Sequence, residues 1–218
     1  MLVHLSAESV ISAAQDLRPE GTNIEKPRPL ARYLLWLLLT TPGAVLLWRY
    51  SNGATFYGEV IHLSGQWAVW LLIMTMAVSP IRLLFTNAPW TVPLFFCRRY
   101  LGVASFAYAA LHTGVYLVQK KSGERILAES LEPGLLTGWF ALAIFLPLAL
   151  SSNDWSVRLL RRWWKRLHRA IYGAAALVFM HWYLTAFDPT EGLYYLALLT
   201  TLEVLRVTLT LMRRAQAS

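Results

Sequence analysis

The sequence predicts an all-α integral membrane protein, a single bundle of six transmembrane helices with both termini in the cytoplasm. Of its 218 residues, 56% are hydrophobic and 15% are charged, and the mean hydropathy of +0.44 is too high for an ordinary soluble domain. Crossing about 30 Å of hydrocarbon takes roughly 20 helical residues. Six apolar stretches approach that length: 30–48, 61–85, 101–118, 135–150, 170–187 and 193–212.

The ends of these stretches divide the chain into three parts. Residues 1–29 carry Glu8, Asp16 and Glu20 and lack a sustained apolar core, so we expect a mobile cytoplasmic tail and no signal peptide. Residues 30–214 are the expected membrane domain, and residues 215–218 the C-terminal tail. The fourth span is the shortest, but Pro133-Gly134 before it and the polar run 151–154 after it mark clear ends.

The basic residues set the expected orientation. The net charge is +8, and 16 of the 20 Lys and Arg residues fall on the side that holds the termini and the second and fourth loops. Positive charge favours the cytoplasmic side, which places both termini there. The same distribution explains the charge by topology and contact with anionic lipid, and excludes nucleic-acid binding as its cause.

Two histidines, His112 and His181, lie deep in the third and fifth spans. Ionisable side chains at membrane depth are costly, so each predicts a functional site facing the bundle interior. Both fall about two-thirds along outward-running spans, at matching depth in the outer half of the bilayer. Two neutral imidazoles can occupy both axial positions of a haem iron and leave a site suited to electron transfer.

The helix faces below these histidines carry mainly small residues. On the third span they are Ala109, Ser105 and Gly102, and on the fifth they include Ala174 and Ala170. Close helix packing and space for a flat macrocycle both explain such faces, and the sequence leaves both explanations open.

Two further histidines have open roles. His168 precedes His181 by 13 residues, about 20 Å along a helix. It is a candidate ligand of a second, inner haem, or an interfacial residue that binds lipid headgroups or a cofactor phosphate. His62, at the outer start of the second span, could approach the outer haem or be a solvated end residue. His4, in the tail, is assigned no role.

Arginines in the second and fourth loops suggest an anion site on the cytoplasmic side. Arg98, Arg99, Arg166 and Arg169 could contact a haem propionate, a flavin phosphate or a lipid headgroup, because guanidinium groups form paired hydrogen bonds with such anions. Topology and general lipid contact explain them equally well.

Absent motifs narrow the chemistry. Cys97 is alone, so the chain has neither a disulfide framework nor a CxxCH motif, and any haem must be held by ligation and packing. No GxGxxG follows a strand, which counts against a self-contained flavin or nicotinamide module. A non-redox transporter or scaffold is the alternative from another class: Glu203 and Arg206 can meet on one helix face, although no inverted repeat of broken helices supports a transporter.

Several motifs resemble those of a known family. Arg98-Arg99-Tyr100-Leu101-Gly102, continuing into Leu111-His112, resembles the third helix of bacterial ferric-reductase-like haem proteins, and more specifically the MsrQ (YedZ) family. The run from Arg166 to Tyr172, followed by His181-Trp182-Tyr183, is similar to the fifth helix of that family. Residues 61–65 and 79–82 also fit. The resemblance extends from Glu59 to about Arg214.

The resemblance implies a b-type haem protein of the bacterial inner membrane, with one haem or two, that draws electrons from the quinone pool. Flavin mononucleotide is a candidate additional cofactor. The implied partner is a periplasmic molybdopterin subunit that reduces methionine sulfoxide in damaged proteins, with this chain as the electron-transfer half of a heterodimer.

On this resemblance His112 and His181 fall on the haem ligands and His168 on a histidine implicated in haem binding. Arg99 stands where a two-haem ferric reductase needs another histidine. A transmembrane metal reductase with a separate flavin reductase is the redox alternative.

Overall fold

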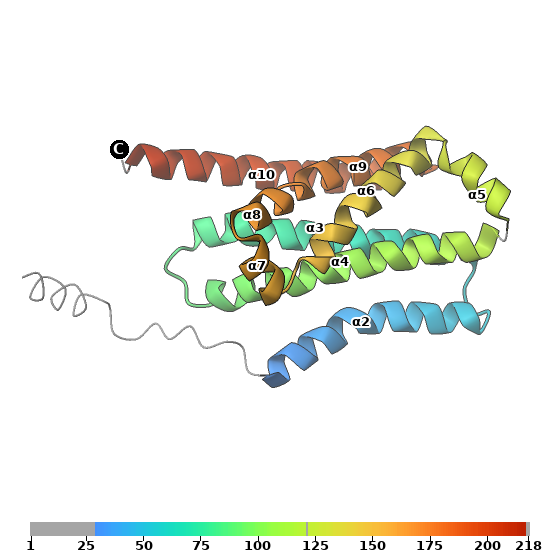
Figure 1. The fold of residues 1–218 in the computed structure, drawn as a ribbon, viewed down its shortest axis with the longest axis horizontal. Helices are drawn as coiled ribbons and strands as arrows, with labels where there is room; N and C mark the ends of the chain where they lie inside the picture. Colours follow the sequence, from blue (N-terminus) through green and yellow to red (C-terminus); the bar gives the residue numbers. More distant parts are fainter. Residues whose placement is uncertain (1–28, 121, 217–218) are drawn as a thin grey trace, which may run out of the picture.

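The computed structural model describes residues 29–120 and 122–216, and within them every regular element is a helix (Figure 1). The predictions for His4 and for the tail up to residue 28 lie outside the described residues. The helices are α2 (Pro29–Ser51), α3 (Tyr57–Leu84), α4 (Thr91–Lys120), α5 (Gly123–Ser130), α6 (Pro133–Leu150), α7 (Asp154–Leu160), α8 (Arg162–His168), α9 (Ile171–Thr185) and α10 (Thr190–Gln216).

Five helices in the described part of the chain are long and apolar enough to cross a membrane: α2, α3, α4, α6 and α10. They correspond to the first four predicted spans and the sixth. The fifth predicted span, 170–187, contains only the 15 residues of α9, about 22 Å of helix. The chain is therefore an all-helical membrane protein, and α9 is shorter than the hydrocarbon thickness of about 30 Å.

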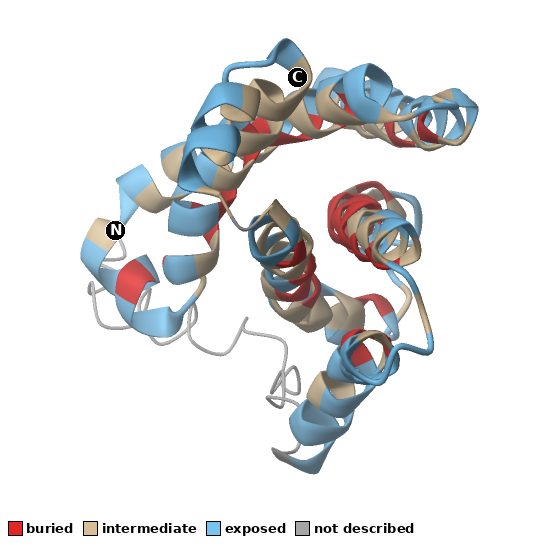
Figure 2. Cartoon of the chain, turned by 90° about the vertical axis from the view of Figure 1, so that its right-hand side faces the viewer, coloured by how far each residue is buried: buried red, intermediate tan, exposed pale blue. Residues whose placement is uncertain are grey.

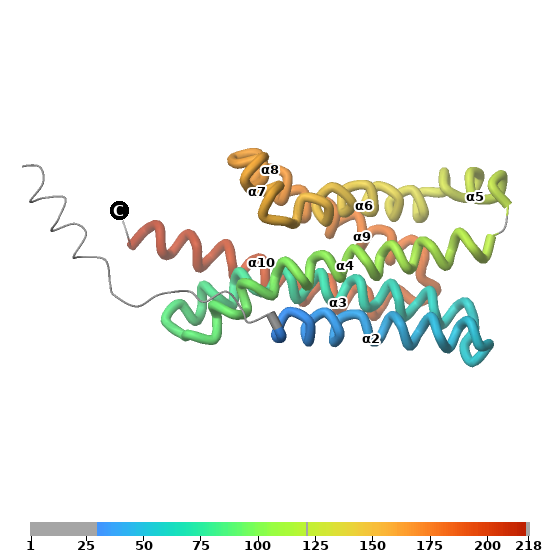
Figure 3. Tube along the Cα trace, turned by 60° about the horizontal axis from the view of Figure 1, so that its bottom comes forward, coloured from blue at the N-terminus to red at the C-terminus, as the bar shows by residue number. Residues whose placement is uncertain are grey.

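The long helices pack around α3, which runs parallel to α10: His62 contacts Glu191 near the start of both helices, and Leu83 contacts Arg213 near their ends. Helix α3 packs along α4, α6 along α9, and α10 against α3. Helix α2 lies beside α3 and α4. The short helices α7 and α8 follow α6 and lie on the side of α4 away from α2 (Figure 3). One apolar core joins α3, α6, α9 and α10, and a second joins α2, α3 and α4.

The outer surface is rich in exposed apolar side chains. Buried residues gather on the helix sides that face one another, and exposed residues cover the outside (Figure 2). Leu38 and Trp48 on α2 are 71% and 66% exposed. A surface of this composition fits lipid as its surroundings, because soluble monomers rarely expose large continuous apolar patches.

Local sequence explains several helix ends. Pro133 begins α6, where its missing N–H leaves no bond unmade. The Asn153 side chain caps α7 by accepting a hydrogen bond from the Ser156 N–H at 2.8 Å. Arg161, with a φ of 45°, separates α7 from α8 by a left-handed turn that non-glycine residues rarely adopt.

Two features differ from the sequence-based expectation. Helix α4 begins at Thr91, ten residues before the predicted span, so Arg98 and Arg99 lie on a helix and not in a loop. The predicted loop 119–133 contains the end of α4 and the helix α5, which the apolar pattern did not predict.

Candidate functional site

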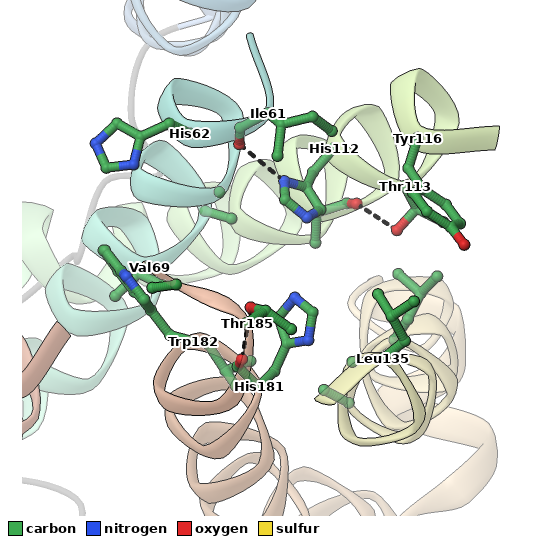
Figure 4. Close-up of a pocket in the computed structure, with 18 of the residues that line it drawn as sticks. Ile61, His62, Val69, His112, Thr113, Tyr116, Leu135, His181, Trp182 and Thr185 are labelled. Atoms are coloured by element: carbon green, nitrogen blue, oxygen red, sulfur yellow. Dashed lines mark hydrogen bonds between the residues drawn. The ribbon is translucent and has the colours of Figure 1, made fainter. Parts of the chain in front are cut away.

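A cavity of about 760 Å³ opens between α3, α4, α6 and α9, and both predicted ligand histidines line it. His112 comes from α4 and His181 from α9, and their rings face each other across the space (Figure 4). The ring centres are 6.1 Å apart and the ring planes are perpendicular, at 90°. The structure thus brings together two residues 69 positions apart in the sequence.

A backbone carbonyl orients the His112 ring. Its Nδ1 lies 3.0 Å from the carbonyl oxygen of Ile61 on α3 (Figure 4). The Ser64 hydroxyl lies 3.4 Å from the same nitrogen. A carbonyl oxygen only accepts, so Nδ1 donates and the neutral ring keeps a free lone pair on Nε2. Histidines that bind a metal through one ring nitrogen usually donate a hydrogen bond from the other ring nitrogen in this way.

His181 is held in the same way from a different helix. Its Nδ1 lies 2.8 Å from the carbonyl oxygen of Gly134, in the first turn of α6. The same reasoning makes Nδ1 the donor and leaves Nε2 as the free acceptor. One cavity therefore contains two imidazoles in the same tautomer, each with an unused lone pair.

Two glycines give the rings room. A Cβ atom on Gly65 of α3 would lie 3.2 Å from His112 Nδ1, and one on Gly138 of α6 would lie 2.8 Å from His181 Nδ1. Sequence reasoning missed both glycines and both carbonyl partners. A glycine inside an apolar span was the one available signal for Gly138, whereas a backbone carbonyl carries no sequence signal.

The residues present fit a haem. Metal–imidazole bonds are about 2.0–2.1 Å long, which puts the centres of two imidazoles on opposite sides of one metal ion roughly 6 Å apart. In the described ranges, no three His, Cys, Asp or Glu side chains converge to hold a bare metal ion. Two imidazoles alone therefore suit a metal that brings its own equatorial ligands, as haem iron does.

The walls of the cavity agree with that fit. Apolar side chains form the inner part, among them Leu72, Leu142, Phe145 and Val178. A polar group lies at the other end, where Lys120 Nζ is 2.6 Å from Glu129 Oε2 and the Tyr116 hydroxyl donates to the same carboxylate at 3.0 Å. An apolar interior with a few polar groups is typical of cofactor sites.

His62 lines the same cavity but does not face His112. Its Nε2 is 3.5 Å from Glu191 Oε2, and its ring meets Trp182 edge-on at 6.5 Å between centres. In Figure 4 the ring points away from the histidine pair. Glu191 also bonds to Gln66 and Tyr195, so His62 belongs to a polar group at the rim.

His168 lies on α8, outside this cavity. Its ring stacks on Trp164 with 4.0 Å between centres, and its Nδ1 donates to the Trp164 carbonyl at 3.2 Å. Burial lowers the pKa of His168, and the positive charges of Arg98 and Arg99 lower it further against the opposing effect of the Trp164 carbonyl. Ser152 is its other polar contact, at 3.4 Å from Nε2.

The four candidate arginines do not converge on the cavity. Arg98 donates to the Ser79 hydroxyl at 3.1 Å, and Arg99 forms an ion pair with Asp154 at 2.7 Å. The Arg166 guanidinium lies 4.6 Å from the Trp163 ring centre. At Arg169 the backbone N–H closes the end of α8. Arg98 and Arg99 lie close enough to His168 to affect its charge.

Packing accounts for most of the small-residue faces. The Ser105 hydroxyl donates to the Ala68 carbonyl on α3 at 2.8 Å, and a Cβ on Gly102 would lie 3.5 Å from Thr75. Ala174 is completely buried in the core. Ala109 alone among the five small residues named above lines the histidine cavity. The close-packing explanation therefore holds for the lower part of each face.

These features define a helical membrane protein with an internal cofactor-sized cavity between two opposed histidines. Residues 64–180 match the family described as the ferric reductase like transmembrane component. The chain is also 35% identical over 200 residues to the protein-methionine-sulfoxide reductase heme-binding subunit MsrQ of Brucella ovis, covering 86% of this chain and 87% of that protein. The corresponding Brucella melitensis protein is 34% identical with the same coverage.

The chain belongs to the MsrQ family of heme-binding membrane subunits. No solved structure shows a significant match.

Proposed function

We propose that this chain is the haem b electron-transfer subunit of a methionine-sulfoxide reductase system, with His112 and His181 as the axial ligands. The observation that carries the proposal is the opposed pair of imidazoles, each fixed through Nδ1 by a carbonyl from a neighbouring helix. The printed name of the relatives, a heme-binding subunit of such a reductase, supports the same assignment.

The residues around the histidine pair have two tasks in this function. The Ile61 and Gly134 carbonyls orient the two Nε2 lone pairs. Leu72, Leu142 and Phe145 exclude water from the inner wall. Haem, when bound, supplies one-electron redox chemistry at its iron. If His112 and His181 both held the iron, no site on it would be left for oxygen or a sulfoxide, which favours electron transfer over catalysis.

The proposed electron donor and electron acceptor come from the resemblance to the MsrQ family. Electrons are proposed to come from the quinone pool and to pass to a periplasmic molybdopterin subunit that reduces methionine sulfoxide. The outer segments suited to docking are α5 with its flanking loops and the connection between α9 and α10. The inner cluster of His168, Arg98 and Arg99 is the proposed place for a second, anionic cofactor, either flavin mononucleotide or another haem.

The proposed topology has six crossings with both termini in the cytoplasm. Helix α9 is the short crossing, and it runs antiparallel to α6 because its His181 contacts Gly134 at the start of α6. Trp163, Trp164 and the basic residues of α8 then lie at the cytoplasmic interface, where aromatic and basic residues collect. The histidine cavity falls on the periplasmic side.

One further candidate function has a specific observation in its favour. The match to a ferric reductase like component suits a transmembrane metal reductase that receives electrons from a separate flavin reductase. Both functions use the same histidine pair and differ in donor and acceptor.

The test is reconstitution in liposomes, with a quinol donor inside and either oxidised-methionine protein or ferric citrate outside. We expect sulfoxide reduction only when both this chain and the periplasmic molybdenum subunit are present, and none with His112→Ala. Reduction of ferric citrate by this chain without the partner, and no reduction of sulfoxide with it, would favour the metal reductase.

A further inference from the structure

A second cavity, of about 490 Å³, lies between α3, α9 and α10, on the side of α9 away from the histidine pair. Most of its wall is apolar, and includes Met76, Phe179, Leu196 and Leu199. Neighbouring residues of α9 face the two spaces: Val178 lines the histidine cavity and Phe179 lines this one, two residues before His181. A ligand here would be separated from the histidine pair by one helix.

The apolar wall also contains a polar group, Tyr172, Glu203 and Arg206. Arg206 Nε donates to Glu203 Oε2 at 2.6 Å, and the Arg206 guanidinium lies 4.9 Å from the Tyr172 ring centre. Arg98 of α4 interacts electrostatically with all three. The group therefore combines a carboxylate, a phenol and two guanidiniums contributed by three helices.

The position of this group limits what can contact it. Glu203 lies within the spanning helix α10, and Tyr172, whose ring the Arg206 guanidinium contacts, is the second residue of α9, close to the proposed cytoplasmic interface at α8. A carboxylate and a guanidinium within a spanning helix are costly, and usually mark a substrate or ion pathway. The group therefore lies in the cytoplasmic half of the proposed bilayer, where a neutral ring on an apolar chain can reach it.

We infer that this groove between α9 and α10 binds the headgroup of a lipid-soluble quinol. The ring oxygens of such a molecule both donate and accept hydrogen bonds, which matches the Glu203 carboxylate as acceptor and the Tyr172 hydroxyl and Arg206 guanidinium as donors. The apolar wall suits the ring and the start of its isoprenoid tail. The inference rests on the proposed function, which needs a quinol donor, and adds the place where that donor binds.

The test is photoaffinity labelling of the purified full chain with an azido-substituted, short-tailed quinone. We expect the label on peptides from α9 and α10 that include residues 172–179 and 199–207, and its displacement by an unlabelled short-tailed quinone. Tyr172→Phe should lower labelling several-fold, because it removes a hydrogen-bond donor to the ring oxygens. Glu203→Gln should lower labelling by the reduced, quinol form of the probe several-fold, because it replaces the charged carboxylate acceptor with a weaker, neutral amide.

Glu203→Gln leaves Arg206 without its carboxylate and could unfold the chain, so a variant without a charge change is needed. Ala176→Phe fills the groove, of which Ala176 forms part, and should abolish labelling. Leu198→Phe is the matched control, since Leu198 is an exposed residue of α10 outside the groove. Thermal unfolding in detergent identifies any variant that is misfolded.

Three results would overturn the inference. They are labelling that persists in a folded Ala176→Phe variant, labelling confined to the histidine cavity, and displacement by an anionic phospholipid but not by the unlabelled quinone. The dithionite-reduced minus oxidised spectrum of the same samples tests the proposed function separately. The spectrum should be unchanged in Ala176→Phe. If the parent protein showed no b-type spectrum, the haem assignment would be wrong, but the labelled quinone site would still stand.

Discussion

At the scale of single residues, the histidine pair makes the most direct prediction. His112→Ala and His181→Ala should each remove most of the b-type haem spectrum of purified protein, because each removes one axial ligand. His62→Ala is the control, since His62 lines the same cavity but faces Glu191, and it should keep the spectrum. A full low-spin spectrum in both alanine variants would rule out the ligand assignment.

Gly138 makes a second residue-scale prediction. A Cβ there would lie 2.8 Å from His181 Nδ1, so Gly138→Ala should displace the imidazole and alter or abolish the haem spectrum. Overpacking of this kind destabilises a fold by about 1–3 kcal/mol, measurable by unfolding in detergent. The expected loss includes both the spectrum and part of the stability.

Gly114→Ala provides the matched control for Gly138→Ala. Gly114 lies inside α4 and a Cβ there would meet nothing within 4 Å. Alanine should therefore stabilise this helix, by about 0.5–1 kcal/mol, and leave the spectrum unchanged. If the two variants behave alike, contact between Gly138 and His181 has no role in holding the ring.

At the scale of elements, α8 should make stability depend on pH. The lowered pKa of His168 means that the unfolded chain takes up a proton at a higher pH than the folded chain. Stability is then complete above the ordinary histidine value of about 6.5 and falls as the pH decreases below it, until the folded pKa is reached. Thermal unfolding in detergent between neutral and mildly acidic pH measures this change.

His168→Gln should remove that part of the pH dependence, because glutamine does not titrate in this range. Its stability curve should be flatter than that of the parent below neutral pH. Parallel curves for the two proteins would show that the Trp164-stacked histidine does not titrate differently in the folded state.

The elements also show what sequence alone could predict. Apolar length predicted α2, α3, α4, α6 and α10 as spanning helices, and the cost of an ionisable group in lipid singled out His112 and His181. Helix α9 ends at Thr185, two residues before the predicted end, and begins at Ile171, one residue after the predicted start, because the chain breaks at Arg169 and Ala170. No proline or glycine marks that break.

The partners of the site were less predictable than its histidines. The carbonyls of Ile61 and Gly134 bond the two rings because α3 and α6 pack against α4 and α9 at particular registers. Such registers depend on contacts between distant segments, which periodicity within one segment does not contain. The same limit applies to the groove at Glu203, whose third wall comes from α3.

At the scale of the whole molecule, the structure arranges its two cavities on opposite sides of α9 within one apolar core. Phe179 and Met76 line the groove, Leu72 and Phe145 line the histidine cavity, and all four belong to that core. An electron donor in the groove and an acceptor between the histidines would share an apolar wall. Because α9 separates the two cavities, the proposal also depends on whether α9 crosses the membrane alongside α6, and the membrane topology can be tested.

The orientation prediction uses single cysteines in a Cys97→Ser background, in intact cells. Ser130→Cys at the end of α5 should react with a membrane-impermeant maleimide from the periplasm, because the outer loops hold few basic residues. Ser152→Cys, between α6 and α7, should react only after the cells are permeabilised. Thr190→Cys, at the start of α10, decides the number of crossings. If α9 crosses the membrane, Thr190→Cys should be labelled from the same side as Ser130→Cys. Labelling of Thr190→Cys together with Ser152→Cys would leave five crossings, and the termini would then lie on opposite sides of the membrane.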